Sequence, residues 1–333
     1  MKLLHLIPQG TEFKFIDKRN IAFGGSILAV IASIALFVTV GLNLGIDFVG
    51  GTVIEIKTQQ DQPIENIRGE VSNLNLGNVA VQEFGGPDRF MIRVPLQEAE
   101  IVPEVAAEAA AREDISEMVE GERAQQKVVT TVRTALDAAF PGVSYERTDV
   151  VGPVVSQELA RSGTIAVVLA VVLMLIYIWF RFEWQFSLGA VIALTHDVLL
   201  TIGIFSITQI EFNLPIIAAI LTIVGYSMND TVVVYDRVRE NLRKYKKMPL
   251  SELLDLSIND TLSRTTMTSV TTLLALGSLY VFGGEAIRGF TFAMMWGVVV
   301  GTYSSIFVAA PILLITGVKR DWTGEAHKTV SPI

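Results

Sequence analysis

The sequence contains no cysteine and only three histidines among its 333 residues. Without cysteine there are no disulfides and no thiolate metal sites, and three scattered histidines form neither a His-rich metal site nor an H-E-x-x-H motif. A phosphate-binding G-x-x-x-x-G-K-[ST] loop and a G-x-S-x-G nucleophile motif are also missing. We therefore expect no hydrolytic enzyme, no metal site and no cofactor.

Charged residues are also scarce, at 18% of the chain, whereas 51% of the residues are hydrophobic. This composition is too apolar for a soluble protein. Six segments are long enough to cross a hydrocarbon core ~30 Å thick, which takes about 20 residues. They span 21–42, 162–180, 185–208, 213–235, 264–283 and 289–316. The last contains Gly297-x-x-x-Gly301, a motif for close helix packing. The sequence thus predicts a polytopic α-helical membrane protein with six transmembrane helices.

Basic residues are distributed unevenly between the segments that flank these helices. In the short loops and at the two ends, fifteen lie on one side of the membrane and only Arg288 on the other. By the positive-inside rule, we expect segments 1–20, 236–263 and 319–333 to be cytoplasmic. The long segment 43–161 is then exported. Its ten basic and twenty acidic residues give a net charge of −10, which argues against a nucleic-acid partner.

The exported segment has the pattern of a compact α/β domain. Apolar residues at helical spacing predict helices after Pro63 and over 128–139. Alternating apolar residues predict strands at 52–57, 79–81, 90–94 and 143–147. The order β-α-β-β-α-β is that of ferredoxin-like domains. An acidic stretch at 98–122 is expected to be a solvated helix, either an exposed extension or a docking surface.

Three ionisable residues lie inside the predicted spans, where a carboxylate costs ~2.5–3.5 kcal/mol on insertion scales. Asp230, in the fourth span, should therefore face protein or a hydrated cavity. Arg264 begins the fifth span from the same side, and its long side chain can reach the depth of Asp230. This pair is either a proton-coupling site, in which the carboxylate gains a proton when the cation moves away, or a static buried ion pair.

Other polar side chains near this pair have alternative interpretations. Tyr226 lies one helical turn before the Asp230 carboxylate and can hydrogen-bond to it, and Asn229 belongs to the same motif. Thr268 belongs to a hydroxyl stripe that either lines a wet proton path or packs helices together. The neighbours His196 and Asp197 lie near the membrane midplane, and they form either a relay or interhelical hydrogen bonds.

Several motifs, in order along the chain, resemble those of one family. The sequence G-I-D-F-V-G-G at 45–51 is similar to the D-F-x-G-G motif of SecD and SecF, and V-G-P-V-V-S-Q-E-L at 151–159 to their V-G-P-x-x-S-x-E-L. Further motifs resemble SecF rather than SecD: F-E-W at 182–184, T-H-D at 195–197, G-Y-S-M-N-D-T at 225–231, D-R-V-R-E-N at 236–241 and S-R-T at 263–265. By these motifs the chain is identified as a member of the SecD/SecF family, within the resistance-nodulation-division superfamily.

The resemblance implies a translocase subunit in the bacterial inner membrane, with both ends cytoplasmic and 43–161 periplasmic. Such a subunit joins a SecD homologue, the Sec channel of SecY, SecE and SecG, and accessory subunits. It uses the proton motive force to promote late translocation and release of preproteins. The intramembrane Asp and Arg implicated in the family fall on Asp230 and Arg264, the pair that the residues themselves indicate.

The family's junction motifs fall on residues between the membrane and the exported domain: Asp47, Gly50, Gly51, Gly152 and Pro153. The glycines have a simpler interpretation too, because they allow a tight backbone path into the first strand. Two alternative functions stay open. A small-molecule exporter half would carry a larger exported domain, whereas a non-conducting assembly scaffold for SecD can be distinguished only by experiment.

Overall fold

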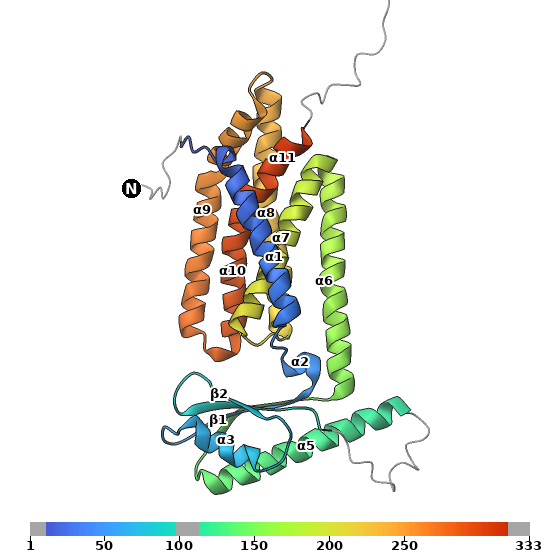
Figure 1. Cartoon of the computed structure of the whole chain (residues 1–333), viewed down its shortest axis with the longest axis vertical. Coiled ribbons are helices and arrows are strands. Elements are labelled where there is room, and N and C mark those ends of the chain that lie inside the picture. The colour runs from blue at the N-terminus through green and yellow to red at the C-terminus, as the bar shows by residue number, and fades with distance from the viewer. Residues whose placement is uncertain (1–10, 98–112, 319–333) are drawn as a thin grey trace, which may run out of the picture.

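The computed structural model describes residues 11–97 and 113–318, which form a helical bundle with a small α/β domain at one end (Figure 1). Six helices in this part of the chain are long and apolar enough to cross a membrane, as the sequence predicts. They are α1 (Arg19–Thr39), α6 (Pro153–Arg181), α7 (Trp184–Thr208), α8 (Leu214–Lys244), α9 (Leu250–Phe282) and α10 (Arg288–Ser304), the last continued by the π-helical turn η3 (Ser305–Ala309) and α11 (Ala310–Thr316).

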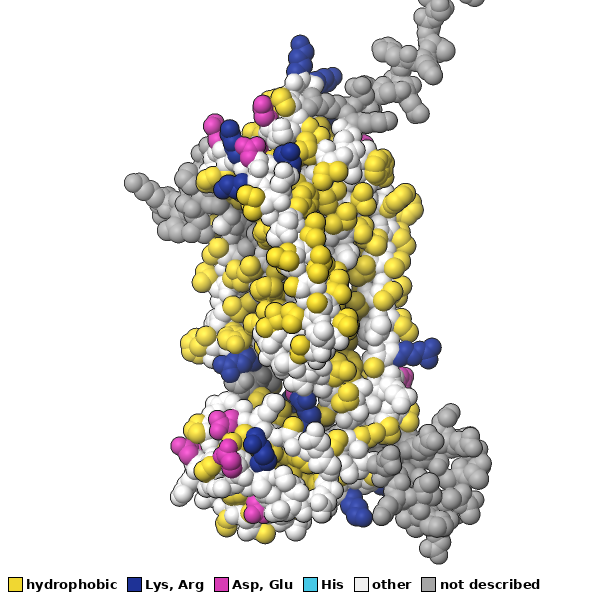
Figure 2. Space-filling view, viewed as in Figure 1, with side chains coloured by type: hydrophobic (Ala, Val, Ile, Leu, Met, Phe, Trp, Pro, Cys, Tyr) yellow, Lys and Arg dark blue, Asp and Glu magenta, His cyan; other side chains and the backbone are white. Residues whose placement is uncertain are grey.

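The side of the bundle is covered with apolar side chains, and Lys, Arg, Asp and Glu gather at its two ends (Figure 2). In the most apolar stretch of α7, α8 and α10, at least half of the residues are buried. In the same stretch of α1, α6 and α9, few residues are buried. Phe180 on α6 and Leu28 on α1, for example, are 85% and 69% exposed. The three inner helices thus form the protected centre, where polar groups can be kept away from lipid.

Two helices extend much further than the apolar segments. Residues 236–263, expected as a loop, are instead the end of α8 and the start of α9, with only 245–249 between them. The apolar stripe continues on both helices, through buried Val238, Leu242, Leu253, Leu254 and Ile258. Hydropathy detects only the part of a helix at membrane depth, so this packed extension went undetected. Similarly, α6 begins at Pro153, nine residues before the predicted span.

The α/β domain follows α1 and the short helix α2 (Ile46–Val49). Its elements occur in the predicted order: β1 (Gly51–Lys57), α3 (Ile64–Ser72), β2 (Ala80–Glu83), β3 (Arg89–Val94), α5 (Glu113–Ala139) and β4 (Ser144–Val151). The sheet has the order β2-β3-β1-β4 with every pair antiparallel. Helices α3 and α5 cover the face that points away from the bundle (Figure 1). Of the acidic stretch, 98–112 lies outside the described residues and 113–122 begins α5.

The domain core consists of the predicted apolar stripes. Its fully buried side chains are Ile54, Ile67, Val71, Phe90, Ile92, Val94, Val132 and Leu136. The other face of β1 is also largely covered, and Glu55 on that face is only 7% exposed. The membrane bundle covers this second face, a contact that strand alternation alone does not reveal.

The start of α1 and the end of α11 lie at the end of the bundle opposite the α/β domain (Figure 1). The segment before α1 is fixed to α9, because the backbone N–H groups of Phe15 and Ile16 donate to Asp255 Oδ1 over 2.8 and 2.9 Å. A 3₁₀ turn, η1 (Ile16–Lys18), then leads into the helix.

Candidate functional site

The junction between the bundle and the domain depends on a carboxylate and two glycines. Asp47 Oδ2 accepts a hydrogen bond of 2.8 Å from the backbone N–H of Leu214, the first residue of α8. Gly50 and Gly51 have φ angles of +73° and +122°. A Cβ on Gly51 would lie 2.5 Å from the carbonyl oxygen of Val94 on β3. The two glycines thus meet a backbone requirement, and Asp47 caps a membrane helix.

At the other junction, β4 passes into α6 through Gly152 and Pro153. Gly152 is the N-cap residue, and its carbonyl accepts a 3.0 Å hydrogen bond from the N–H of Ser156. Pro153 occupies the first turn, where a missing N–H costs nothing. The domain is therefore continuous with a membrane helix at this point.

The sheet also contacts the α7–α8 connection directly. Arg93 on β3 forms an ion pair of 2.6 Å with Glu211 and donates to Asn43 Oδ1 over 3.1 Å. The backbone of Phe212 is paired with that of Asn43 and Gly45, over 2.7 and 2.8 Å. Domain and bundle are thus joined by both side-chain and backbone hydrogen bonds.

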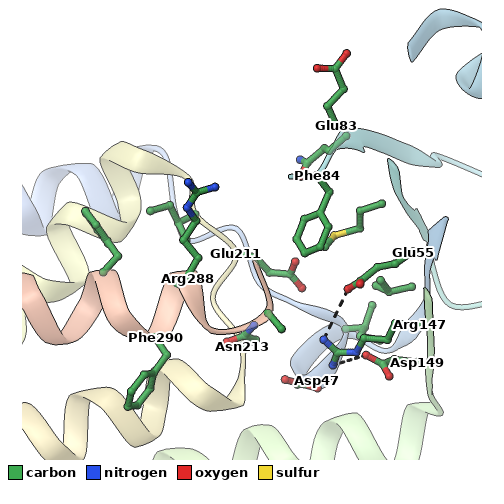
Figure 3. A pocket seen from close by; sticks show the side chains of 18 of the residues that line it. Asp47, Glu55, Glu83, Phe84, Arg147, Asp149, Glu211, Asn213, Arg288 and Phe290 are labelled. Carbon is green, nitrogen blue, oxygen red and sulfur yellow. Dashed lines mark ion pairs between the residues drawn. The ribbon is translucent and has the colours of Figure 1, made fainter. Parts of the chain in front are cut away.

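A cavity of about 370 Å³ lies between the sheet and the bundle (Figure 3). Its acidic lining includes Asp47, Glu55, Asp149 and Glu211. Arg147 pairs with Asp149 over 2.5 Å and with Glu55 over 3.7 Å. Burial raises the pKa of Glu55 despite the nearby arginine. The cavity is a polar interdomain space rather than an apolar ligand pocket.

At the centre of the bundle, Asp197 of α7 is fully buried and joins three helices. Its Oδ2 accepts hydrogen bonds from Ser227 of α8 over 2.5 Å and from Ser304 of α10 over 2.7 Å. Its Oδ1 lies 2.9 Å from His196 Nδ1. Each oxygen of this carboxylate therefore has a hydrogen-bond partner. Of the two interpretations of His196 and Asp197, interhelical hydrogen bonds are present, from α8 and α10 to Asp197.

His196 is 5% exposed and stacks on Tyr303 with ring centroids 6.1 Å apart. The Tyr303 hydroxyl lies 3.1 Å from Ser26 Oγ on α1. His196 Nε2 is buried and has no hydrogen-bond partner among the described residues. Polar contacts thus extend from His196 on α7 to the first membrane helix.

Asp230 lies on α8, three residues after Ser227, and is 3% exposed. Its Oδ2 has no hydrogen-bond partner within the described chain. Arg264 on α9 is exposed and close enough to attract the carboxylate, but the two form no ion pair within 4.0 Å. A static buried ion pair is therefore not what this structure contains.

Hydroxyl groups connect Asp230 with α10 and α9. The carboxyl interacts with the Thr302 hydroxyl of α10, which lies 2.7 Å from Ser269 Oγ on α9. Because Thr302 and Ser304 share α10, and Ser227 and Asp230 share α8, the two buried carboxylates are held by the same pair of helices. We call this set the central polar cluster: Asp197, Ser227, Asp230, Ser269, Thr302 and Ser304.

The remaining candidates lie around this cluster without joining it. The buried hydroxyl of Tyr226 has no hydrogen-bond partner in the described part of the chain, so the bond to Asp230 that the sequence allows is absent. Asn229 is exposed on the outer side of α8. Thr268 donates to the Thr265 carbonyl of its own helix over 2.9 Å.

Close packing of α8 against α10 is confirmed at the glycine motif. A Cβ on Gly297 would lie 2.2 Å from Ile223, and one on Gly301 would lie 2.9 Å from Ser227. The small residues bring the backbones of α8 and α10 together, and a serine from each helix bonds to Asp197 of α7.

Ser227, Thr302 and Ser304 were not identified as site residues from the sequence. Their signal was weak, because hydroxyl residues are common in membrane helices and often bond to their own backbone. A stronger signal for a polar site was the position of Thr302 and Ser304, directly after a helix-packing motif. Among residues 11–97 and 113–318, no group of three His, Asp or Glu is placed to hold a metal ion.

Comparison with known proteins agrees with this architecture. A family model described as "Protein export membrane protein SecD/SecF, C-terminal" matches residues 131–319, and one described as "SecD/SecF GG Motif" matches 35–62. The protein translocase subunit SecF of Rhodobacter capsulatus is 46% identical, over 96% of this chain and 93% of its own. The subunit SecDF of Brucella abortus is 43% identical over 95% of this chain, which covers 39% of that longer protein.

A solved structure shows the same fold. The crystal structure of SecDF from Thermus thermophilus, described as a translocon-associated membrane protein, matches with a TM-score of 0.76 and 32% identity, over 92% of this chain and 39% of its own. A second SecDF structure, in a super-membrane-facing form, gives a TM-score of 0.64. These relatives are translocase subunits rather than enzymes. The chain is a multi-pass membrane protein and belongs to the SecF family of protein translocase subunits.

Proposed function

We propose that this subunit pairs with a SecD homologue and uses the proton motive force to promote late translocation and release of preproteins. The observation that carries the proposal is the central polar cluster, which holds two buried carboxylates among the inner helices. Carboxylates at membrane depth are costly and are kept mainly where they function. In the proposed orientation, both ends of the chain are cytoplasmic and the α/β domain is periplasmic.

A polar strip on the outside of the bundle supports the SecD partner. Asn229 on α8 is exposed, as is Arg264 on the neighbouring α9. Asn229 is fifteen residues from the start of α8, or about 22 Å along the helix. Lipid tails offer no hydrogen bonds to these groups. Another membrane helix with polar side chains would satisfy them, and SecDF relatives join both parts in one protein.

The surroundings of Asp230 support a role in proton coupling. Its carboxylate is attracted by Arg264 but makes no ion pair with it, and one oxygen is unbonded. Protonation removes the attraction to Arg264 and adds a donor next to the Thr302 hydroxyl. Helices α8 and α10 also carry the hydrogen bonds to Asp197. Protonation of Asp230 therefore changes the position of α8 relative to α10. One charge moving across 100 mV supplies about 2.3 kcal/mol to drive the change.

A shift of α8 has a direct route to the periplasmic domain. The first N–H of this helix is bonded to Asp47, four residues before β1. Arg93 ties β3 to Glu211, just before α8. We propose that the domain changes its tilt with α8 while a preprotein is held, and that attachment to the SecY, SecE and SecG channel and its accessory subunits places it at the exit.

The test is export of a slow-folding preprotein in vesicles that contain Asp230→Asn together with SecD, with and without a proton gradient. The matched control is Glu252→Gln, which removes one exposed carboxylate from the first turn of α9. We expect the Asp230 variant to assemble with SecD but to lose gradient-dependent release, while the control keeps it.

Full gradient dependence in Asp230→Asn would overturn the proton role and favour an assembly scaffold, with the proton path in SecD. Loss of SecD association in both variants would indicate misfolding rather than coupling. Arg264→Lys keeps the cation, so it should retain more gradient-dependent release than Arg264→Gln.

A further inference from the structure

The imidazole of His196 on α7 has one bonded and one unbonded nitrogen. Nδ1 lies 2.9 Å from Asp197 Oδ1, whereas Nε2 is buried and has no hydrogen-bond partner among residues 11–97 and 113–318. The whole residue is 5% exposed. A buried polar atom without a partner is rare in folded chains, and an ionisable group at membrane depth is a candidate for function.

The hydrogen bonds of Asp197 indicate which nitrogen of the neutral ring carries the proton. Asp197 Oδ2 accepts from the hydroxyls of Ser227 and Ser304 over 2.5 and 2.7 Å, as expected for an ionised carboxylate. An ionised carboxylate can only accept, so Nδ1 of His196 is the donor to Oδ1. In the neutral ring Nε2 then has an unshared lone pair, and it is the nitrogen that can gain a proton.

Proton uptake at Nε2 would remove a net charge from the centre of the bundle. With a neutral ring, the pair of His196 and Asp197 carries one negative charge, although the two side chains are only 5% and 0% exposed. With a proton on Nε2, the same pair is an ion pair without net charge, and the hydrogen bond from Nδ1 stays in place. Where water is excluded, an adjacent opposite charge strongly favours the charged form of a titratable group.

The helices packed against α7 bring no second charged partner to this ring. Helices α1 and α10 each carry one charged residue, at the first position, and η3 and α11 carry none. Helix α6 has its charges in its first third and at its last residue. On α8, Asp230 is the one charge before the extension that starts at residue 236, and no hydrogen bond of the described residues joins it to His196. The titratable hydroxyls of these helices are those of Tyr177, Tyr226, Tyr235 and Tyr303.

Of these tyrosines, Tyr303 of α10 stacks on His196. The ring centroids lie 6.1 Å apart and the interplanar angle is 26°. An aromatic face attracts a cation at about this distance. The Tyr303 hydroxyl donates to the Ala22 carbonyl of α1 over 3.2 Å and lies 3.1 Å from Ser26 Oγ. A charge on His196 would therefore act on α1 through Tyr303, and on α8 and α10 through Asp197.

We propose that His196 is a second proton-binding site of this chain, with Nε2 as the proton acceptor and Asp197 as the residue that positions the ring and stabilises its charged form. The proton binds to Nε2 and leaves from it, and no other covalent bond changes. Because α1 leads through α2 into β1, this site acts on the α/β domain through the first membrane helix, whereas Asp230 acts through α8. The inference rests on the proposed function, since a proton gradient must drive the site, but protonation of the ring can be measured without transport.

The first test observes the ring in the full-length chain, purified in detergent. Replacing the two other histidines of the sequence, His5 and His327, by glutamine leaves His196 as the one imidazole to observe. With ¹⁵N-labelled histidine, we expect NMR to show that Nε2 gains its proton between about pH 5 and 8, while Nδ1 stays protonated throughout. Asp197→Asn should weaken proton binding about tenfold or more, a downward shift of the midpoint by at least about one pH unit. The matched control, Glu252→Gln, removes an exposed carboxylate and should leave the midpoint unchanged.

An Nε2 signal that stays constant over this pH range would overturn the proposal, because His196 would then be a structural hydrogen-bond donor. An equal midpoint with Asp197 and with Asn at this position would overturn the role of the carboxylate. Should Asp197→Asn not fold, as judged by gel filtration, the titration of His196 in the otherwise unchanged site still decides the proposal.

The second test is release of a slow-folding preprotein in vesicles that also contain SecD, with and without a proton gradient. We expect His196→Gln to assemble with SecD and to lose most of the gradient-dependent release, while the matched control His327→Gln keeps it. Full gradient dependence in His196→Gln, together with its loss in Asp230→Asn, would overturn this inference and leave the proposed function in place. Full gradient dependence in both variants would overturn the inference and the proposed function together.

Discussion

The carboxylate of Asp47 caps α8, because it accepts a hydrogen bond from the backbone N–H of Leu214, 167 residues later in the chain. The segment after the first membrane helix is thereby bonded to the start of the fourth. Through this bond, the first helix, the α/β domain and α8, which carries Ser227 and Asp230 of the central polar cluster, share a junction. The aspartate of the junction motif thus has a structural role that explains its position.

Removal of this cap should destabilise the chain measurably. We expect Asp47→Ala to cost about 1 kcal/mol, the usual cost of a lost N-cap. Asp47→Asn keeps an acceptor oxygen, so it should lose less than half as much. The measurement is the thermal unfolding midpoint in detergent. Equal losses in the two variants would show that the charge, rather than the hydrogen bond, carries the effect.

A second prediction concerns the backbone at Gly51. Gly51→Ala places a Cβ 2.5 Å from the Val94 carbonyl at a φ of +122°, so β1 must shift away from β3. We expect a loss of about 1–3 kcal/mol and faster amide exchange in both strands. Gly69→Ala is the control, because that glycine lies inside α3 with open space around it. It should be neutral or stabilise the helix by up to about 1 kcal/mol. Comparable protection in both variants would contradict the steric argument.

The bonds of Asp197 can be tested by a double-mutant cycle with Ser304. Asp197→Ala leaves the hydroxyls of Ser227 and Ser304 and the His196 ring without their acceptor, which should cost about 3 kcal/mol or more. The coupling energy with Ser304→Ala should lie near 0.6–1.7 kcal/mol, the range found for hydrogen bonds within membranes. Ser206→Ala serves as the control, because the hydroxyl of this serine donates to the Ile202 carbonyl of its own helix. A coupling energy of zero between Asp197 and Ser304 would exclude a direct interaction.

Much of this architecture is predictable because it depends on local patterns. Hydropathy located all six spans, and alternation at residues such as Ile54 and Ile92 located the strands and their core. The cost of a charge in lipid was enough to single out Asp230 and Asp197. Each of these inferences needs only the residue type and its periodicity.

Contacts between distant segments were not predictable from those patterns. The partners of Asp197 come from α8 and α10, and hydroxyl residues carry no signal of which helix they face. Arg264 was expected to pair with Asp230, but only the arrangement of α8 and α9 decides the distance. The burial of Glu55 also depends on the bundle that covers the sheet, since the strand pattern by itself predicts exposure.

The burial of Glu55 leads to a prediction about pH. Its pKa is raised above the ordinary value of 4.5, first by burial and then by neighbouring Asp149, Glu146 and Glu211, against the opposing effect of Arg147. Between 4.5 and the folded-state pKa, the folded chain therefore binds more protons than the unfolded chain. The contribution of Glu55 to stability is then highest below pH 4.5 and falls as the pH rises through its folded-state pKa.

Glu55→Gln removes this ionisation while keeping the size of the side chain. We expect the variant to be more stable than the wild type at about pH 8 and no more stable at about pH 4, measured as unfolding midpoints of the full chain. Glu83→Gln is the control, because Glu83 lines the same cavity but is exposed on β2. If Glu55→Gln were instead less stable at the higher pH, the ion pair with Arg147 would outweigh the cost of burial. The carboxylate would then be a stabilising contact of the interdomain cavity.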